Sequence, residues 1–319
     1  MEPKQYYIGI DVGGTSVKEG LFDEDGNLLA KASVPTPPIV DAAGFAAVTE
    51  AIDQVVAKAQ IPRAFVAGIG LAVPCPIPAS GDAKVKANIA INLPELKIAI
   101  QEHCPDAVVK YENDANAAAL GEYAAGAGKG SQSMVAVTQG TGVGGGAILN
   151  GKLYTGFNYA GMEIGHFVIE HGGRLCTCGR RGCFEAYCSA TALIKRTRQA
   201  MEEDRTSRLW ELAGSLEGVN GRTPFDAAAQ GDPAAGKVID EYVDYLGCGV
   251  ASLVNIFQPE VICIGGGPSA QGETLMAPVR YILNREDYAR NNLHRTRLVR
   301  AALGNDAGII GAALLPLFR

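Results

Sequence analysis

The feature that most constrains the fold is an order of strands and glycine turns that occurs twice. Its first copy consists of apolar, strand-like runs at 6–12, 16–22 and 28–34, separated by the turns Gly13-Gly14 and Asp25-Gly26. Its second copy has runs at 134–138, 143–149 and 152–155, separated by Gly140-Thr141-Gly142 and Asn150-Gly151. These two copies predict a duplicated fold in which each half offers a glycine turn to a shared cleft, unless two glycine-rich hairpins are alike by chance.

The rest of the chain alternates helices with strands. Helical patterns cover 42–59, 96–103, 114–125, much of 185–257, 275–284 and 307–317, and strand patterns cover 65–72, 108–112, 259–264 and 298–302. From about Pro233, one helix carries apolar residues on one face: Val238, Tyr242, Tyr245, Leu246, Val250 and Leu253. The pattern predicts an α/β fold with mixed sheets, and 319 residues favour two lobes over one core.

Composition argues against several classes of function. The net charge is −6 and no basic run occurs, so we expect no nucleic-acid partner. The first residues, Met1 to Tyr7, lack the basic and apolar regions of a signal peptide, and no apolar stretch is long enough to span a bilayer. We therefore expect a cytoplasmic protein without a membrane partner. Four isolated cysteines are expected to be small buried hydrophobic residues: Cys75, Cys104, Cys248 and Cys263.

Three glycine turns are candidates for nucleotide binding. In the first, Gly13, Gly14 and Thr15 can donate to phosphate oxygens, Lys18 adds positive charge, and Asp11 can hold Mg²⁺ through water; the alternative is an ordinary hairpin with a polar turn. The second turn, Gly140-Thr141-Gly142, has the same ingredients. Two such turns can hold a triphosphate from both sides.

The third turn, Gly265-Gly266-Gly267, formally matches a G-x-G-x-x-A dinucleotide motif through Ala270. It lies late in the chain without a clear companion unit, so contact with an adenine or ribose is the preferred interpretation. A plain strand-to-helix turn is the alternative. A Walker A loop is absent from the sequence.

Asp114 lies where the strand ending near Glu112 enters a helix. A carboxylate in this place is suited to act as general base for a hydroxyl that attacks phosphate. The alternative interpretation is that Asp114 is only the N-cap of the helix.

The most specific motif is a cluster of cysteines that follows His166. Cys176, Cys178 and Cys183 with His166 supply the four ligands of a tetrahedral, structural Zn²⁺ site, and Cys188 is an alternative fourth ligand. A C-x-C disulfide would be strained. We call the segment 176–183 the cysteine knuckle. Three residues beside it are suited to form hydrogen bonds with sugar hydroxyls: Glu163, His166 and Glu185. The alternative is that each glutamate is a solvated surface residue, which is the more common case for any single glutamate.

Together these motifs resemble the ROK family of bacterial sugar kinases, within the actin-like ATPase superfamily. The resemblance runs from Asp11-Val12-Gly13-Gly14-Thr15 to Asp306-Ala307-Gly308, and its sharpest elements are Glu163-Ile164-Gly165-His166 and the stretch from Cys176 to Glu185. It implies a two-lobed, ribonuclease H-like fold with a central cleft. It also implies that Asp114 is the catalytic base, that the sugar contacts are Asn113, Asp114, Glu163, His166 and Glu185, and that His166, Cys176, Cys178 and Cys183 bind zinc.

The resemblance further implies a smaller lobe of residues 1–113, joined by a returning helix at 305–319, and a larger lobe of residues 114–304. It implies a homodimer or homotetramer. One departure concerns the segment Ala72-Val73-Pro74-Cys75-Pro76-Ile77, where the family usually has Gly at the position of Cys75. Family repressors carry an added N-terminal DNA-binding domain, and this chain starts directly on its first strand.

The sequence therefore predicts a kinase that uses Mg·ATP to phosphorylate the 6-hydroxyl of a hexose, with glucose as the first choice. N-acetylglucosamine, N-acetylmannosamine, allose and fructose are alternative substrates. A sugar sensor without catalysis is a further alternative, which the presence of Asp114 and both phosphate turns disfavours.

Overall fold

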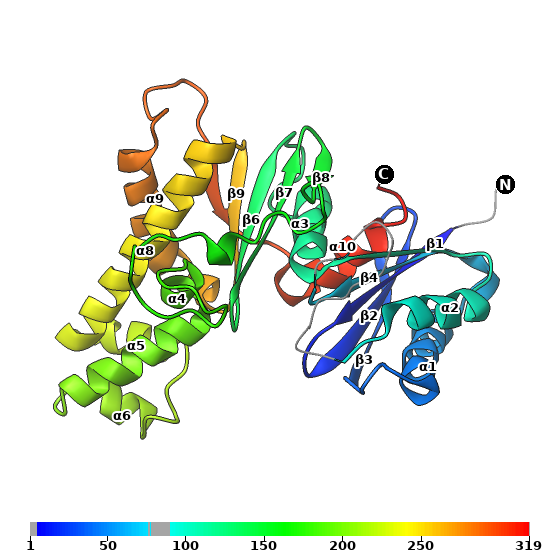
Figure 1. Ribbon diagram of the computed structural model, residues 1–319, viewed down its shortest axis with the longest axis horizontal. Helices are drawn as coiled ribbons and strands as arrows, with labels where there is room; N and C mark the ends of the chain where they lie inside the picture. The colour runs from blue at the N-terminus through cyan, green and yellow to red at the C-terminus, as the bar shows by residue number, and fades with distance from the viewer. Residues whose placement is uncertain (1–4, 76, 78–89, 319) are drawn as a thin grey trace. The chain divides into compact units, whose positions relative to one another are not determined.

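The computed structural model describes residues 5–75, 77 and 90–318 (Figure 1). Residues 1–4, 76, 78–89 and 319 lie outside this range. The predictions about a signal peptide, the Cys75 segment, the smaller lobe and the returning helix each include some of these residues. The chain divides into two compact units. The first comprises the described residues up to Ser133, with Gly146–Met162 and the described residues from Leu303 onward; the second comprises Met134–Gly145 and Glu163–Ala302. Residues 114–133 thus lie in the first unit, and the functional lobe boundaries stated above stay a prediction.

The first five-stranded sheet belongs to the first unit. Its strands are β1 (Tyr6–Val12), β2 (Ser16–Asp23), β3 (Leu28–Pro35), β4 (Val66–Val73) and β5 (Val108–Asn113). They lie in the order β3-β2-β1-β4-β5. The three amino-terminal strands pair antiparallel, whereas β1 pairs parallel with β4 and β4 parallel with β5. The sheet is therefore mixed, as predicted.

The second five-stranded sheet repeats this topology. Its strands are β6 (Met134–Gln139), β7 (Val143–Leu149), β8 (Lys152–Tyr154), β9 (Val261–Gly266) and β10 (Arg297–Arg300). Their order is β10-β9-β6-β7-β8, with β9 parallel to β6 and to β10, and β7 antiparallel to β8. Read from β8, it is the order of the first sheet, so the predicted duplication is confirmed.

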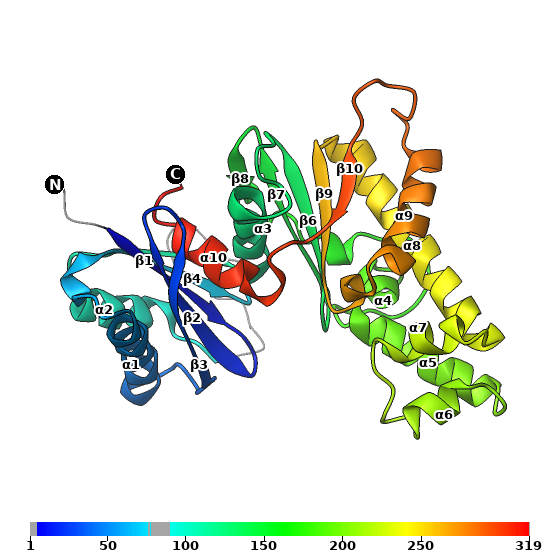
Figure 2. The same cartoon turned by 180° about the vertical axis from the view of Figure 1, so that it is seen from behind.

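Helices cover both faces of the first sheet (Figure 2). α1 (Ala42–Ala59) and α2 (Leu93–His103) pack with Ile8, Ile10 and Leu21 in one apolar core. α2 begins three residues earlier than predicted, because the Asn92 side chain caps it and Pro94 suits its first turn. On the other face lies α10 (Ala307–Leu314), which ends before Pro316, whereas the sequence predicted a helix to residue 317.

α10 touches its neighbours at the level of the backbone. A Cβ atom on Gly9 of β1 would lie 1.8 Å from the carbonyl oxygen of Ile309, and one on Gly311 would lie 1.6 Å from the carbonyl oxygen of Ala117 in α3 (Asp114–Ala125). Only glycine permits so close an approach. These glycines allow α10 to lie directly against β1 and α3.

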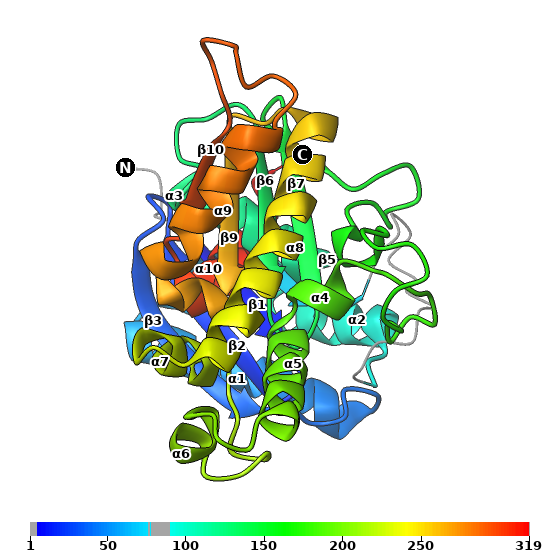
Figure 3. The ribbon, with the colours of Figure 1, turned by 90° about the vertical axis from the view of Figure 1, so that its left-hand side faces the viewer.

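The helices of the second unit follow the cysteine motif at 176–183. They are α4 (Glu185–Cys188), α5 (Ala190–Glu203), α6 (Leu209–Ala213), α7 (Thr223–Ala229), α8 (Pro233–Phe257) and α9 (Glu273–Glu286). α8 buries the predicted apolar face, except that Tyr245 is only partly covered. α8 and α9 lie side by side, with Gly247 against Ile282 (Figure 3).

One predicted strand is displaced. The sequence predicted a strand over 259–264 and a turn over 265–267, but β9 runs from Val261 to Gly266. Pro259 has no N–H to pair, and the register with β6 continues as far as Gln139 opposite Gly266. None of the helices that the structure describes is both long and apolar enough to cross a membrane.

Candidate active site

The first glycine turn joins β1 to β2. The Gly13 N–H donates to the Ser16 carbonyl at 3.0 Å, and the Thr36 hydroxyl donates to the Gly13 carbonyl at 2.6 Å. Gly14 and Thr15 are exposed. The turn is thus held at its base by hydrogen bonds, while its tip is accessible to a ligand.

Asp11 and Lys18 face each other across the strands that flank this turn. Burial raises the pKa of the Asp11 carboxyl, and the charge of Lys18 lowers it in part. Gly308 leaves room for Asp11, because a Cβ atom on Gly308 would lie 2.9 Å from its Oδ2. A half-buried carboxylate at a strand end, beside a turn with accessible N–H groups, fits the oxygen ligands that Mg²⁺ prefers.

Asp114 is the first residue of α3, and Asn113 is the N-cap. The Asn113 side chain accepts hydrogen bonds from the N–H groups of Ala115 and Asn116 at 3.0 and 3.2 Å, while Asp114 Oδ1 accepts from Ala115 at 2.8 Å. The interpretation of Asp114 as only an N-cap is therefore wrong, since Asn113 fills that position.

Two groups lie beside Asp114 and shape its surroundings. Cys75 is buried, which raises the pKa of its thiol, and the charge of Asp114 raises it further. Burial also raises the pKa of Glu112, although hydrogen bonds from the Asn116 amide and the Asn113 N–H oppose this. Asp114 thus shares its end of β5 with a thiol and with a second carboxyl group.

The second and third glycine turns lie at the ends of the parallel neighbours β6 and β9. The Gly140 N–H donates to the Gly142 carbonyl at 2.9 Å, and Thr141 is exposed. The Gly267 N–H donates to the Gln139 carbonyl at 3.1 Å. Gly266 has a φ of +96°, and a Cβ atom there would lie 1.9 Å from the same carbonyl oxygen. The structure therefore brings these two predicted turns together.

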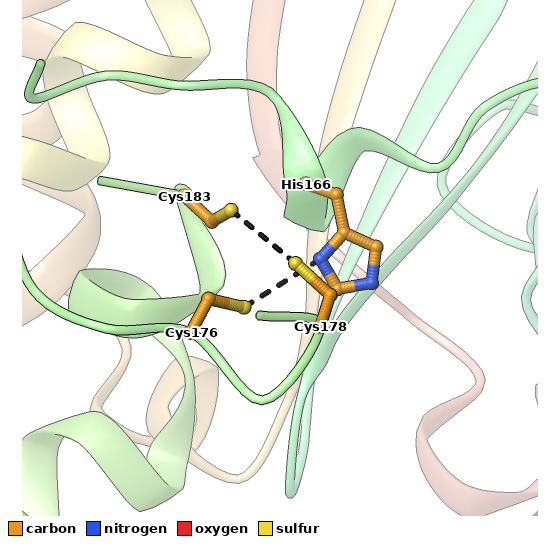
Figure 4. Close-up of side chains that lie close together, drawn as sticks. All are labelled: His166, Cys176, Cys178 and Cys183. Carbon is orange, nitrogen blue, oxygen red and sulfur yellow. Dashed lines mark hydrogen bonds between the residues drawn. The ribbon is translucent and has the colours of Figure 1, made fainter. Parts of the chain in front are cut away.

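The four predicted zinc ligands also come together (Figure 4). The ligand atoms of His166, Cys176, Cys178 and Cys183 all lie within 4.8 Å of one another. The Cys178 and Cys183 sulfurs are 3.7 Å apart, and the Cys176 sulfur is 3.7 Å from His166 Nδ1. A tetrahedral zinc site with Zn–S bonds of about 2.3 Å has ligand separations of roughly 3.8 Å. The donor atoms thus fit zinc in kind and in spacing.

Cys188, the alternative fourth ligand, is not a member of this cluster. Its side chain is fully buried, and its carbonyl accepts hydrogen bonds from Gln139 and Tyr242. Figure 4 shows that His166 Nδ1 faces the thiols, while Nε2 points away from them.

The three thiols differ in acidity. Burial, followed by hydrogen bonding to Cys178, raises the pKa of Cys183 to about 12. A backbone hydrogen bond at Arg180 is the main cause that lowers the pKa of Cys178. Closely packed thiolates repel one another, and a bound cation reverses this effect because it favours the deprotonated ligands.

The predicted sugar-contact residues near the knuckle differ in exposure. Glu163 is exposed, and its carbonyl accepts a hydrogen bond from the His166 N–H at 3.0 Å. Glu185 is half-buried: Oε1 accepts from the Thr177 hydroxyl at 2.9 Å and from the Cys176 thiol at 3.5 Å, and Oε2 accepts from the Val143 N–H at 3.1 Å. The knuckle thus holds the Glu185 carboxylate in one orientation.

The site residues divide between the two units. Asp11, the first turn, Lys18, Asn113 and Asp114 belong to the first unit, and the other predicted site residues belong to the second. Sequence reasoning missed Gln139 and Tyr242, whose side chains meet behind the second turn. A polar Gln139 at the end of the apolar run Met134–Val137 was the signal that could have revealed them.

Comparison with known proteins identifies the family. The model of the ROK family matches residues 7–317. The chain belongs to the ROK family. A glucokinase from Thermotoga maritima is 38% identical over 317 residues, which cover 98% of this chain and 97% of the relative. A glucokinase from Streptomyces coelicolor is 36% identical over 310 residues, covering 96% of each chain.

A solved structure supports the same family. A ROK family glucokinase from Streptomyces griseus, in complex with glucose and AMPPNP, superposes with a TM-score of 0.79 at 34% identity, covering 97% of this chain and 98% of that one. ROK sugar kinases have the actin-like ATPase fold, whose two halves share one strand order. The predicted fold class and the predicted family are thereby confirmed.

Proposed function

We propose that this ROK protein is an ATP-dependent glucokinase that transfers the γ-phosphate of ATP to the 6-hydroxyl of glucose. The observation that carries the proposal is the near-full-length similarity to glucokinases, at 38% identity for the relative from Thermotoga maritima. The complex of a related ROK glucokinase with glucose and AMPPNP supports both substrates.

Asp114 is proposed to be the general base. It accepts the proton of the attacking sugar hydroxyl as the phosphoryl group arrives, the role that an aspartate has in other kinases. Its place in the first turn of α3 supports this role, because the helix end stabilises the negative charge of the carboxylate before it takes the proton.

The three glycine turns are proposed to bind the nucleotide. The first two turns donate to the phosphate oxygens: Gly13, Gly14 and Thr15, with Lys18, in the first, and Gly140-Thr141-Gly142 in the second. The third turn, Gly265, Gly266 and Gly267, contacts the adenine or ribose. Asp11 is proposed to hold Mg²⁺, which when bound neutralises charge on the transferring phosphoryl group.

Five residues are proposed to bind the sugar: Asn113, Asp114, Glu163, His166 and Glu185. The proposal for Glu185 is supported by its fixed orientation, because an acceptor that is already oriented loses little entropy when a hydroxyl binds. His166 is proposed to hold zinc through Nδ1 and a sugar hydroxyl through Nε2, which points away from the thiols.

The zinc ion is proposed to be structural. His166, Cys176, Cys178 and Cys183 would hold it, and four protein ligands leave no open coordination position for catalysis. When bound, the metal cross-links the loop between Glu163 and Glu185. A cytoplasmic location, a role in glycolysis and assembly as a homodimer or homotetramer stay predictions.

The proposal is tested by measuring ADP release with Mg·ATP and a panel of hexoses and N-acetylhexosamines. We expect the highest kcat/KM with glucose. A higher kcat/KM with N-acetylglucosamine, N-acetylmannosamine, allose or fructose would establish a different kinase of the same family. No turnover with any sugar, together with a thermal shift on sugar binding, would contradict the kinase and establish a sensor.

A further inference from the structure

A buried amide lies directly behind the second glycine turn. Gln139 is the last residue of β6, its side chain is 0% exposed, and Gly140 follows it. The first four residues of the strand, Met134–Val137, are all apolar. Burying an amide is costly unless its polar atoms are paired, so the partners of Gln139 indicate what the residue contributes.

The Gln139 amide nitrogen pairs with two groups of the second unit. It donates to the Cys188 carbonyl at 2.9 Å and to the Tyr242 hydroxyl at 2.8 Å. The Tyr242 hydroxyl in turn donates to the Cys188 carbonyl at 2.8 Å, which closes a triangle of hydrogen bonds. Burial raises the pKa of Tyr242 well above its ordinary value, so its hydroxyl keeps the proton that it donates.

The other amide atom makes this arrangement costly. Within the part of the chain that the structure describes, Gln139 Oε1 has no hydrogen-bond partner and is buried. An unpaired buried acceptor destabilises a protein, whereas an apolar side chain of the same shape would not. The amide therefore does not act as a simple filler of the core.

The backbone around Gln139 is held by the same surroundings. The Gly140 carbonyl accepts from the Ala190 N–H at 2.9 Å, and the Gln139 carbonyl accepts from the Gly267 N–H at 3.1 Å. Gln139 and Gly140 are thus hydrogen-bonded to the junction of α4 and α5, to α8 and to the third glycine turn.

We propose that Gln139 is a positioning residue for the nucleotide phosphates. With Tyr242 and the Cys188 carbonyl it sets the place of Gly140, so that the N–H groups of Thr141 and Gly142, which follow it in the turn, are oriented before the nucleotide binds. This inference rests on the proposed use of ATP and goes beyond it, because it assigns a role to residues that do not touch either substrate. Preorganised donors lose less free energy on binding than donors that must first be ordered.

The decisive variants remove the hydrogen bonds and keep the volume. Gln139→Met replaces the amide by an apolar side chain of similar length, and Tyr242→Phe removes only the hydroxyl. The matched control is Thr197→Val. Thr197 is also 0% exposed in the second unit, and its hydroxyl donates to the Leu193 carbonyl within α5.

Calorimetry measures the affinity of each purified variant for Mg·ADP and, separately, for glucose. We expect Gln139→Met to weaken Mg·ADP about tenfold and glucose less than about twofold, with Tyr242→Phe in the same direction. The double variant should bind Mg·ADP about as tightly as the weaker-binding of the two single variants, because the two side chains act as one unit. Thr197→Val should change neither affinity.

Three results would overturn the inference: unchanged Mg·ADP affinity in Gln139→Met, equal losses for both ligands, or an equal loss in Thr197→Val. A wild type that binds Mg·ADP but phosphorylates no sugar would refute only the proposed function. The comparison of variants stays decisive in that case, because it measures binding and not turnover. A wild-type protein that binds no Mg·ADP would overturn both.

Discussion

The Glu185 carboxylate accepts a hydrogen bond from the Val143 N–H at 3.1 Å, and it thereby connects the cysteine knuckle to the second glycine turn. Its other oxygen accepts from the Thr177 hydroxyl at 2.9 Å. The Gly142 hydrogen leaves the space for this contact, since a Cβ atom on Gly142 would lie 2.3 Å from Glu185 Oε2. One side chain thus fixes the position of two predicted substrate-binding segments.

This relationship predicts that loss of Glu185 affects both substrates. Glu185→Ala removes the acceptor of Val143 and the proposed sugar contact, so we expect KM to rise about tenfold or more for glucose and severalfold for ATP. Steady-state kinetics with each substrate varied in turn checks this. Glu170→Ala is the control, because Glu170 is exposed and its carboxylate accepts a hydrogen bond from the Tyr245 hydroxyl, away from the second glycine turn. An effect on glucose alone would show that the contact with Val143 is unimportant for ATP.

Asp114→Asn should remove the general base while the capping of α3 by Asn113 is kept. We expect kcat to fall about 10²–10⁴-fold and the Kd for glucose to change little. Single-turnover kinetics and glucose calorimetry measure the two quantities. Asp106→Asn, which changes an exposed carboxylate of the same unit, should behave as the wild type. Near-normal kcat in Asp114→Asn would rule out the assignment.

Zinc should be present in the purified protein at about one ion per chain and should be lost in Cys178→Ser. Because the metal cross-links the loop, we expect its removal by a chelator to lower the melting temperature and to weaken glucose binding. Elemental analysis and thermal unfolding measure both effects. Cys188→Ala is the control, and it should retain the metal because Cys188 lies outside the cluster. Loss of zinc in that variant instead would favour the alternative ligand set.

The stability of the protein should depend on the ionisation of Glu19. Its carboxyl is 0% exposed and has no hydrogen-bond partner among the described residues, and burial raises its pKa well above 4.5. The folded state therefore holds the proton more tightly than the unfolded state. This group's contribution to stability is complete below the unfolded pKa and is lost as the pH rises through the folded pKa.

Glu19→Gln should remove this loss. We expect the melting temperature of the variant, relative to the wild type, to increase from about pH 5 to about pH 8. Over this range the unfolded wild type is stabilised by losing the Glu19 proton, whereas a glutamine does not titrate. Glu24→Gln changes an exposed residue of the following turn and serves as the control. A difference that does not vary with pH would show that Glu19 has the same pKa in the folded and unfolded states, which would contradict the prediction.

Gly311→Ala should disturb the contact between α10 and α3. The added methyl group would lie 1.6 Å from the Ala117 carbonyl oxygen, and such overlap costs about 3 kcal/mol or more, or prevents folding. Gly236→Ala in α8 is the matched control, because its added Cβ would meet nothing within 4 Å. That control should gain up to about 1 kcal/mol from helix propensity. Urea unfolding measures both changes, and equal stabilities would contradict the close approach.

Local patterns were sufficient to predict most elements of this chain. α1 was predicted with its observed ends, because Asp41 caps its start and its last residue precedes Gln60 in a left-handed conformation. The Asn150-Gly151 hairpin follows from two residues that tolerate positive φ. The wrong details, such as the start of α2 and the end of β9, lie where a neighbouring side chain or strand decides the boundary.

What the sequence by itself determined was the repeated strand order and the cysteine and histidine motif proposed to bind metal, because both depend on residues that are close in the chain. Only the tertiary structure decided that His166 and not Cys188 completes the cluster, that Asn113 and not Asp114 caps α3, and that Glu185 holds Val143. It also placed Gln139 against Tyr242, 103 residues further along. Spacing along a chain specifies periodicity, whereas contacts between distant residues depend on how the sheets and helices pack, and that packing is a property of the whole fold.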